Sequence, residues 1–586
     1  MKSFLKYLLA SFFGVFLALI VIFLIGMGSM SALLSSKTND VKIKPHTVLD
    51  LNLKTPITDR SIESPLNIVN FQTMEMSGTL GLFDILQNLE KAATDPNIEG
   101  LLIQASMMTP GIATLQEIRN AILKFKKSGK FVIAYGDIFT QTGYYLASAA
   151  DKIYINPEGA IEFRGLHSEI MFYTEALKKI GVDVQVMRHG KFKSAVEPFL
   201  KTSMSEASKK QSKAYLDAIW GEMLTDIAES RNLSVDQLNK LADKFAVRTP
   251  ETALENDFID GLFYLDQLQD EIRNLTGYTS TDKVRSVSML NYLSTPNPVK
   301  RDYTSDRIAI IYGSGTIGMN NNGPSSIGGH HLAKAIRKAR TNSKIKAIVF
   351  RVNSPGGNVL ASEIIRREVE LAAAEKPLVI SMGDLAASGG YWVSTPAHRI
   401  FANTTTLTGS IGVFGLWPNA QELVTNKIGI HFDGVQTNEL AGMGSIFRPL
   451  KPQERAIIQS QIEDTYNKFL QKVASDRDME VSEVASIGEG RVWSGKDAIS
   501  IGLIDELGGL EASIQWAAQE AGLDNYRIRE MPQLKDPLEE ILNQILGRPG
   551  QVSRIIKSEF PLIRDLQETV NGGPIQARLP YTLIIR

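Results

Sequence analysis

The chain has 586 residues, of which 43% are hydrophobic and 22% are charged, and its formal net charge is −1. This length predicts three or four domains, or two large ones, and this composition excludes a disordered chain and a polytopic membrane protein. The balanced charge argues against a nucleic-acid partner, and the absence of cysteine excludes disulfides, thiolate metal sites and a cysteine nucleophile. The seven histidines show no HExxH or HxH spacing, so we expect no metal site.

An apolar segment near the N-terminus, residues 7–30, predicts a membrane-spanning helix. It carries no charge, and at about 1.5 Å rise per residue it would span roughly 36 Å, enough for a hydrocarbon core of about 30 Å. Lys2 and Lys6 precede it, which favours a cytoplasmic N-terminus. A cleaved signal peptide is the alternative, but the apolar run is long for one and no clear A-x-A site follows. We therefore expect residues 1–36 to form a cytoplasmic start and a retained anchor.

The sequence contains an internal duplication. At an offset of 247 residues, VIAYGD (132–137) lies over VISMGD (379–384), and Gly143 lies over Gly390. The match extends over most of a domain, which indicates a duplicated domain rather than a short solenoid repeat. A polar, proline-bearing stretch separates the copies and is typical of a linker. The expected first repeat, linker and second repeat are residues 46–293, 294–306 and 307–530.

Strand and helix patterns alternate within each repeat. Residues 345–353 form a continuous apolar run, as in a strand buried on both faces, and 377–383 form the next strand. Helical patterns at 331–342 and 361–375 flank the first of these strands. The alternation predicts an α/β fold with mostly parallel strands.

Longer helical patterns occur near 453–475 and, in the first repeat, near 203–230. The second of these opens with Ser203 and Glu206, the spacing of a capping box. The C-terminal part, residues 531–586, contains apolar residues at helical spacing. We favour docking of this helix face on the chain itself or on a sister subunit over membrane binding. The face consists of Leu538, Ile541, Leu542, Ile545 and Leu546.

The two repeats differ where chemistry is expected. Ser388 aligns with Gln141, and the paired glycines Gly356-Gly357 have no counterpart in the first repeat. Conversely, Lys193 lies in the first repeat, and the aligned part of the second has no lysine. One copy keeps a serine and the other a lysine, which is the asymmetry expected of a single site shared between two copies.

Ser388 stands at a position suited to a nucleophile, after a buried strand and at a helix start. Free N–H groups at a helix N-terminus attract developing negative charge, and Gly389 allows close approach of a substrate. An amide from Gly356-Gly357 could complete an oxyanion hole, worth about 2.7–4 kcal/mol per donor. No histidine is placed as the base, but a buried lysine with a lowered pKa can serve. Taken singly, Ser-Gly-Gly is more often a turn and a lysine more often a solvated charge.

Four motifs together resemble the signal peptide peptidase A family in its long form, also called protease IV. The resemblance implies a tandem duplication of a crotonase/Clp-protease-like domain in a serine peptidase without metal or cofactor. It also implies an inner-membrane protein with its catalytic domains in the periplasm, a homotetramer, and released signal peptides as substrates. The motifs are VNSPGG (352–357), GDLAASGGYWVSTPA (383–397), TGSIGVFG (408–415) and GKFKSAVEPF (190–199).

The resemblance also assigns roles to residues. It implies that Ser388 is the nucleophile, Lys193 the general base, and Gly357 and Gly389 the oxyanion donors, with Ser410 orienting the lysine. Two other classes stay open: an acyl-CoA enzyme of the same fold, and a non-catalytic membrane scaffold in which Ser388 is merely part of a turn.

Overall fold

The structure is a computed structural model. Most of the predicted membrane segment and the whole of the predicted apolar face at 538–546 lie outside its described residues, so both stay predictions. Within the part of the chain that is described, no helix is both long and apolar enough to cross a membrane. The described residues are 6–7, 11–15, 17–18, 21, 42–53, 57–61, 79–105, 110–278, 284–299, 304–320, 326–533 and 575–578.

The first repeat is built on a parallel sheet whose strands are largely buried, as expected for strands covered on both faces. In sheet order the strands are β8 (Gly261–Leu262), β6 (Lys152–Ile161), β5 (Phe131–Phe139), β4 (Ile98–Gln104), β1 (Thr47–Asn52) and β9 (Ser286–Ser288). The helices are α3 (Leu82–Thr94), α4 (Ile112–Lys126), α5 (Gln141–Ala147), α6 (Thr174–Ile180), α7 (Glu197–Leu200), α8 (Glu206–Arg231), α9 (Val235–Asp243), α10 (Pro250–Glu255), α11 (Leu265–Thr276) and α12 (Met289–Leu293). A separate short pair joins β2 (Ile57–Thr58) and β3 (Leu80–Gly81).

The second repeat has a corresponding sheet, parallel except where its edge strand β19 joins. In sheet order the strands are β19 (Val492–Ser494), β17 (Leu407–Gly409), β15 (Leu378–Ala387), β13 (Ile345–Ser354), β10 (Arg307–Ser314) and β21 (Arg527–Met531), while β16 (Arg399–Ala402) pairs with β15 and β20 (Glu506–Leu507) pairs with β16. The helices are α13 (Gly329–Thr341), α14 (Val359–Ala373), α15 (Gly389–Trp392), α16 (Pro452–Arg477), α17 (Val481–Ile487), α18 (Gly495–Ser500) and α19 (Leu510–Glu520), and a π-helical segment covers Glu422–Ile428.

These elements confirm the α/β prediction with mostly parallel strands and the two long helices. The strand predicted at 377–383 continues to Ala387, because Leu385 and its neighbours also pair with β17. The predicted capping box at Ser203 is wrong. Helix α8 begins at Glu206, and its N-cap is Ser205, whose side chain accepts a hydrogen bond from the amide of Ser208.

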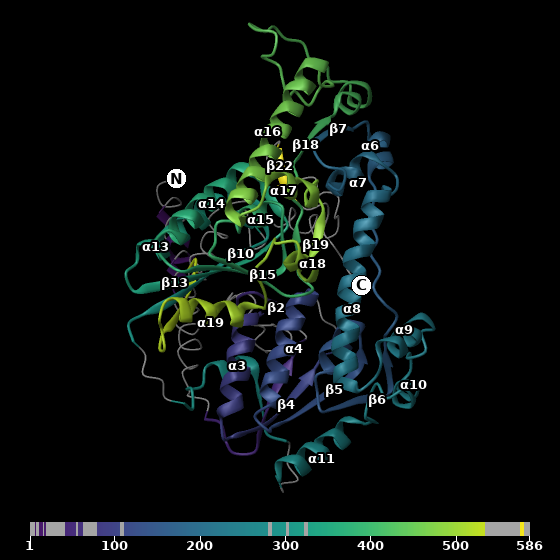
Figure 1. Ribbon diagram of the computed structural model, residues 1–586, viewed down its shortest axis with the longest axis vertical. Coiled ribbons are helices and arrows are strands. Elements are labelled where there is room, and N and C mark those ends of the chain that lie inside the picture. The colour runs from purple at the N-terminus through teal and green to yellow at the C-terminus, as the bar shows by residue number, and fades with distance from the viewer. Residues whose placement is uncertain are drawn as a thin grey trace.

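One hydrophobic cluster spans the two repeats, and a further cluster lies mainly in the second repeat. Helices α3 and α4 lie between the first sheet and α19 of the second repeat (Figure 1). Buried residues of β4, such as Leu101, and of β13, such as Val349, belong to the same contiguous cluster. The repeats are therefore packed as parts of one unit rather than as independent domains.

A buried ionic network crosses the same boundary. Arg351, at the end of β13, is fully buried, and its guanidinium lies 2.9 Å from a carboxylate oxygen of Asp59 and 2.8 Å from one of Glu117. The carboxylate of Asp384, on β15, accepts hydrogen bonds from the amide and hydroxyl of Thr114 at the start of α4. Since breaking one partner of a buried pair typically costs about 3–5 kcal/mol, this network fixes the first repeat against the strand ends of the second.

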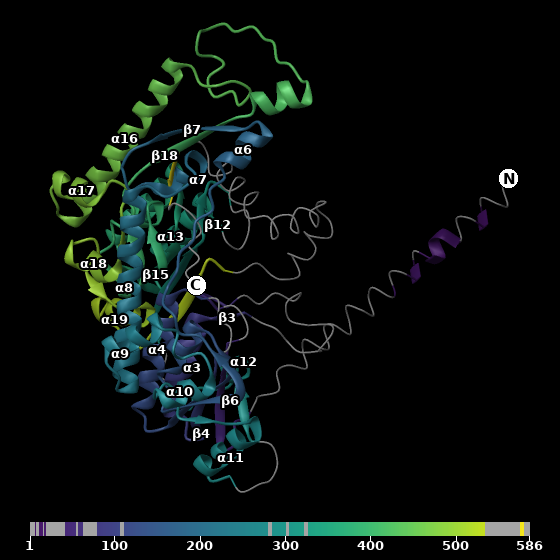
Figure 2. The same cartoon turned by 90° about the vertical axis from the view of Figure 1, so that its right-hand side faces the viewer.

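A third sheet mixes strands from both repeats and from the C-terminal part. Helix α8 of the first repeat also packs against β19 of the second, so the chain crosses between the repeats at this end (Figure 2). The pairs involving the last three strands of this sheet are antiparallel. In sheet order its strands are β12 (Ser326–Gly328), β11 (Thr316–Gly318), β14 (Gly356–Asn358), β22 (Ile575–Arg578), β18 (Phe414–Asn419) and β7 (Asp183–Arg188).

Candidate active site

Lys193 and Ser388, which are 195 positions apart in the sequence, meet in the structure. The Nζ atom of Lys193 lies 2.8 Å from the Oγ atom of Ser388. It also donates to the backbone oxygen of Ser410 at 3.1 Å and contacts the hydroxyl of Ser410 at 3.0 Å. All three residues are fully buried. The structure thus brings together the predicted serine, lysine and lysine-orienting residue.

The lysine reaches the second repeat because β7 pairs antiparallel with β18. The chain leaves β7 at Arg188, turns at Gly190 and places Lys193 immediately before a 3₁₀ helix at Ser194–Val196. The guanidinium of Arg188 donates to the backbone oxygen of Lys193 at 3.1 Å, which holds this turn. The pairing of two strands from different repeats therefore carries the lysine to the serine.

Two glycines leave room for the lysine. A Cβ atom at Gly490 would stand 2.7 Å from the Cβ and the amide nitrogen of Lys193, and one at Gly412 would stand 3.2 Å from its Cδ. The φ angle of Gly490 is also positive, at 79°. A side chain at Gly490 would therefore both strain the backbone and displace Lys193.

The surroundings of Lys193 favour its neutral form. Burial removes the ammonium group from water, and this desolvation lowers the pKa of Lys193 well below its usual value of 10.5. Its nearest polar partners are serine oxygens and a carbonyl. A neutral lysine within hydrogen-bond distance of a serine hydroxyl can act as a general base.

Ser388 occupies a strained backbone conformation. Its φ and ψ angles are 56° and −114°, between the end of β15 and the start of the short helix α15. Such a conformation costs a non-glycine residue on the order of 1–3 kcal/mol and is found mainly at functional sites. The amide of Ser388 donates to the backbone oxygen of Gly409 at 2.8 Å, which helps to hold the turn. The turn aims the hydroxyl at Lys193.

Of the two predicted oxyanion donors, Gly389 lies beside the serine, and Gly357 lies in the strand next to it. Gly389 follows Ser388 directly, and a Cβ atom at Gly356 would stand only 2.6 Å from the amide nitrogen of Gly389. Gly357 continues β14, and a Cβ there would stand 2.0 Å from the backbone oxygen of Ile317. No other residue type fits at Gly356 or Gly357 without movement of the backbone, so these glycines allow β14 to approach the amide of Gly389, next to Ser388.

Sequence reasoning missed Gly412, Gly490 and the C-terminal strand β22. The glycines have no local signature of a role, because each matters only through its approach to a lysine from the other repeat. His398 does not serve as a base for Ser388: its Nδ1 atom accepts a hydrogen bond from the amide of Leu378, at the far end of β15.

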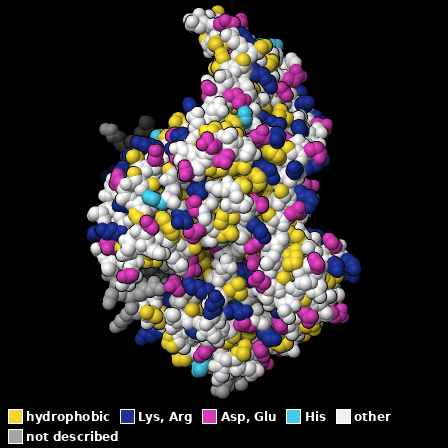
Figure 3. Space-filling model, viewed as in Figure 1, with side chains coloured by type: hydrophobic (Ala, Val, Ile, Leu, Met, Phe, Trp, Pro, Cys, Tyr) yellow, Lys and Arg dark blue, Asp and Glu magenta, His cyan; other side chains and the backbone are white. Residues whose placement is uncertain are grey.

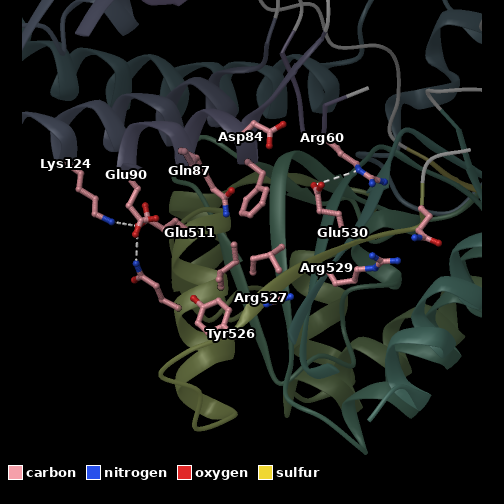
Figure 4. Close-up of a pocket in the computed structure, with 16 residues that line it drawn as sticks. Arg60, Asp84, Gln87, Glu90, Lys124, Glu511, Tyr526, Arg527, Arg529 and Glu530 are labelled. Atoms are coloured by element: carbon pink, nitrogen blue, oxygen red, sulfur yellow. Dashed lines mark hydrogen bonds and ion pairs between the residues drawn. The ribbon is translucent and has the colours of Figure 1, made fainter. Parts of the chain in front are cut away.

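A cavity of about 930 Å³ lies elsewhere, between α3, α19 and β21. Figure 4 shows its charged side chains facing one another: Lys124 pairs with Glu511, and Arg60 lies 3.9 Å from Glu530. Neither Ser388 nor Lys193 lines it. Its opposite charges compensate each other, so we assign the cavity no part in the chemistry.

Comparisons with known proteins match both repeats of the chain. The sequence profile of peptidase family S49 matches residues 124–279 and 370–524, one segment within each predicted repeat. The chain is 37% identical to Protease 4 of Haemophilus influenzae, over 75% of this chain and 73% of the relative. It is 36% identical to Protease 4 of Salmonella typhi, over 80% and 76%, and 32% identical to the chloroplastic serine protease SPPA of Arabidopsis thaliana, over 92% and 78%.

These matches confirm the resemblance and the duplication of a crotonase/Clp-protease-like α/β domain, while the exact repeat boundaries stay predictions. They also favour the peptidase over the acyl-CoA enzyme and the non-catalytic scaffold. The chain therefore belongs to peptidase family S49 and is a serine peptidase with two S49 domains.

Proposed function

We propose that this chain is a membrane-anchored endopeptidase that degrades released signal peptides and other hydrophobic, extended peptides through an acyl-enzyme. Ser388 is the nucleophile and Lys193 the general base. The observation that carries the assignment is the buried Nζ atom of Lys193, 2.8 Å from the Ser388 hydroxyl. The mechanism uses no metal or cofactor.

The hydrogen bonds around Lys193 define the direction of proton transfer. The backbone oxygen of Ser410 can only accept, so it takes one N–H of a neutral Lys193. The hydroxyl of Ser410 lies 3.2 Å from the backbone oxygen of Gly490 and donates to it, which leaves its own oxygen to accept the second N–H. The lone pair of Nζ is then free for the proton of Ser388. Ser410 thus acts as a positioning residue for the base.

The reaction then follows from this geometry. Ser388 attacks the peptide carbonyl while its proton passes to Lys193, and amides of Gly357 and Gly389 stabilise the oxyanion. The protonated lysine gives its proton to the leaving amine. Water activated by the same lysine then hydrolyses the ester and regenerates Ser388. Because the lysine comes from the first repeat and the serine from the second, neither repeat alone is active.

The location and assembly are part of the same proposal. The apolar residues 7–30, after Lys2 and Lys6, support a single-pass anchor in the inner membrane with the catalytic domains on the periplasmic side. In Figure 3 hydrophobic side chains occur on the projecting end of the molecule beyond α16, among charges of both signs. This segment supports self-association into a homotetramer, because it exposes Ile428, Ile430, Phe432, Val435, Met443 and Ile446.

The test is hydrolysis of a fluorogenic hydrophobic signal-peptide substrate by the purified full-length chain. Ser388→Ala and Lys193→Met are each expected to lower kcat on the order of 10⁴- to 10⁶-fold, as removal of a nucleophile or its base does in serine peptidases. Lys191→Met is the matched control, because Lys191 is exposed and pairs with Glu489 at 2.9 Å. It should keep the parent rate.

Labelling with a fluorophosphonate provides a second readout. The parent and Lys191→Met should be labelled at Ser388, and Ser388→Ala should not. Near-parent hydrolysis by Ser388→Ala or Lys193→Met would show that the dyad is wrongly assigned. Folded protein that neither hydrolyses the peptide nor takes the label would contradict the proposal as a whole.

A further inference from the structure

One buried glutamine holds the segment that carries Lys193. Gln211 lies near the start of α8 and is only 1% exposed. Its Nε2 atom donates to the backbone oxygen of Phe192 at 3.0 Å and to the hydroxyl oxygen of Ser194 at 2.8 Å. These residues lie on either side of Lys193, so a single side-chain amide holds the backbone both before and after the base.

The segment between these two contacts is an inverse γ-turn with Lys193 at its centre. The φ and ψ angles of Lys193 are −73° and 71°, close to the values of about −75° and 65° typical of this turn. The amide of Ser194 donates to the backbone oxygen of Phe192 at 2.7 Å, which closes the turn. Gln211 donates to this same oxygen and to the side chain at the other corner. Its hydrogen bonds therefore fix the backbone from which the side chain of Lys193 leaves.

The same amide ties the γ-turn to the second repeat. The Oε1 atom of Gln211 accepts from the amide of Val492 at 3.3 Å, at the start of β19. Only one orientation of the side chain is possible, because the amide of Val492 can only donate and the backbone oxygen of Phe192 can only accept. Val492 comes two residues after Gly490, which lies against Lys193. Gln211 thus connects the turn with the segment on the other side of the lysine.

We propose that Gln211 is a positioning residue for the general base, and that it holds the γ-turn at Lys193 against the second repeat. The inference rests on the proposed peptidase function and adds a residue to the same site. The hydrogen bonds of Gln211 reach the backbone and one hydroxyl next to Lys193, so it acts through the lysine and not on the substrate. Its loss should therefore affect kcat rather than KM.

The test replaces Gln211 by leucine in the full-length chain. Gln211→Leu removes these hydrogen bonds and should lower kcat on the order of 10-fold, less than the roughly 10²-fold typical of a 1 Å displacement, with an unchanged KM for the fluorogenic peptide. The rise of kcat/KM with pH should also move to higher pH. A looser turn lets water reach the amine, and burial is what lowers the pKa of Lys193. The charged groups around the turn are the same in both chains: Arg188, Lys191, Glu197, Glu489 and Arg491.

Gln116→Leu is the matched control. Gln116 is also buried and lies in α4 of the first repeat, and its side-chain amide hydrogen-bonds to the hydroxyls of Thr404 and Thr405 in the second repeat. Its replacement removes contacts between the repeats without touching the turn at Lys193, so the variant should keep the kcat and pH profile of the parent. Equal losses of kcat in the two variants would overturn the inference, and so would an unchanged kcat and pH profile in folded Gln211→Leu.

Ser194→Ala covers the case in which Gln211→Leu does not fold. It removes one hydroxyl and with it one of the two hydrogen bonds that Gln211 donates. We expect the same changes at a smaller size, with a loss of about threefold in kcat and a smaller shift of the pH profile. If Gln211→Leu cannot be obtained folded, a parent-like kcat and pH profile in Ser194→Ala would overturn the inference.

The stability of the protein provides a readout without turnover. Between the lowered pKa of Lys193 and 10.5, the unfolded parent binds more protons than the folded parent, so the contribution of Lys193 to the free energy of unfolding rises with pH. In Gln211→Leu the pKa lies nearer to 10.5, and urea unfolding should show a smaller rise, whereas Gln116→Leu should show the rise of the parent. Equal rises in all three chains would refute the inference even if no chain hydrolyses the peptide. Hydrolysis by the parent together with equal rises would refute the inference alone and leave the peptidase function standing.

Discussion

The two repeats use the same strand-to-helix turn for different purposes. In the first repeat, Thr140 precedes α5 with φ −67° and ψ 162°, and its hydroxyl caps the helix by accepting from the amide of Gly143 at 3.2 Å. In the second repeat, Ser388 precedes α15 with φ 56° and ψ −114° and makes no side-chain cap. The first turn is relaxed and closed by its own side chain, whereas the second is strained and directs its side chain to Lys193.

The residue aligned with Ser388, Gln141, makes hydrogen bonds that hold the first repeat together locally. The side-chain oxygen of Gln141 accepts from the amides of Arg164 and Gly165 at 3.0 and 2.9 Å, and its NH₂ group donates to the backbone oxygen of Gly165 at 3.1 Å. Gly165 aligns with Gly412, which adjoins Lys193 in the second repeat. In the first repeat, the side chain of Gln141 therefore hydrogen-bonds the segment at Gly165. In the second repeat, Lys193 from the other repeat lies against the aligned glycine.

Outside the dyad itself, the largest effect on activity is expected at Gly490, where the second repeat makes room for Lys193. Gly490→Ala places a Cβ atom 2.7 Å from the backbone and Cβ of Lys193, so the base must move. A displacement of about 1 Å typically costs on the order of 10²-fold in rate, and we expect a loss of this size in kcat/KM. Steady-state hydrolysis of the fluorogenic peptide measures it.

Gly429→Ala is the matched control for this substitution. Gly429 also has a positive φ, of 83°, but a Cβ there has no atom within 4 Å. Both variants carry a similar backbone strain, and only Gly490→Ala touches Lys193. Equal losses in the two variants would mean that strain in the backbone, and not the position of the lysine, limits the rate.

Much of the fold and of the site could be predicted from the sequence. The buried strands are continuous apolar runs, and the duplication exposes Ser388 and Lys193, because each residue survives in one copy only. Gly389 could be predicted as well, because it adjoins Ser388 in the same motif. Local patterns and the comparison of the copies were sufficient for these features.

The remaining features depend on contacts between distant segments. Gly490 looks like an ordinary turn residue until Lys193 is placed against it, and Ser205 takes the cap that the spacing at Ser203 suggested. The strand β22 is four residues long and lies more than 150 residues from its partners β14 and β18, so nothing in its own sequence predicts the pairing. Side-chain patterns report burial, but they do not report which backbone edge a short segment will join.

The dependence of activity on pH tests the role of Lys193. Because burial lowers the pKa of Lys193, kcat/KM should rise about tenfold per pH unit below that lowered pKa and level off above it. The same shift affects stability. Between the lowered pKa and 10.5 the unfolded chain binds more protons than the folded chain, so the contribution of Lys193 to stability becomes more favourable as pH rises.

Lys193→Met removes this protonation equilibrium and the cost of burying an amine. We therefore expect the inactive variant to have a higher free energy of unfolding than the parent at neutral pH, and the difference should narrow as pH approaches 10.5. Urea unfolding at several pH values measures it, with Lys191→Met as control. A difference that does not change with pH would show that Lys193 titrates normally.

The smallest expected effects concern stability at the two aligned turns, and they have opposite signs. Gln141→Ala leaves two backbone amides and one backbone carbonyl without their side-chain partner. Because Arg164 is exposed, water can replace part of these hydrogen bonds. We therefore expect the free energy of unfolding to fall by about 1–3 kcal/mol, with kcat unchanged. Ser388→Gly relieves a positive φ of 56° that glycine adopts without strain, so we expect a gain of about 1 kcal/mol with activity lost. Urea unfolding of both variants, beside the parent, measures the pair. If Ser388→Gly were instead destabilising, the hydrogen bond between Ser388 and Lys193 would outweigh the strain, and the active turn would be held by the dyad itself rather than by the sheet and helix around it.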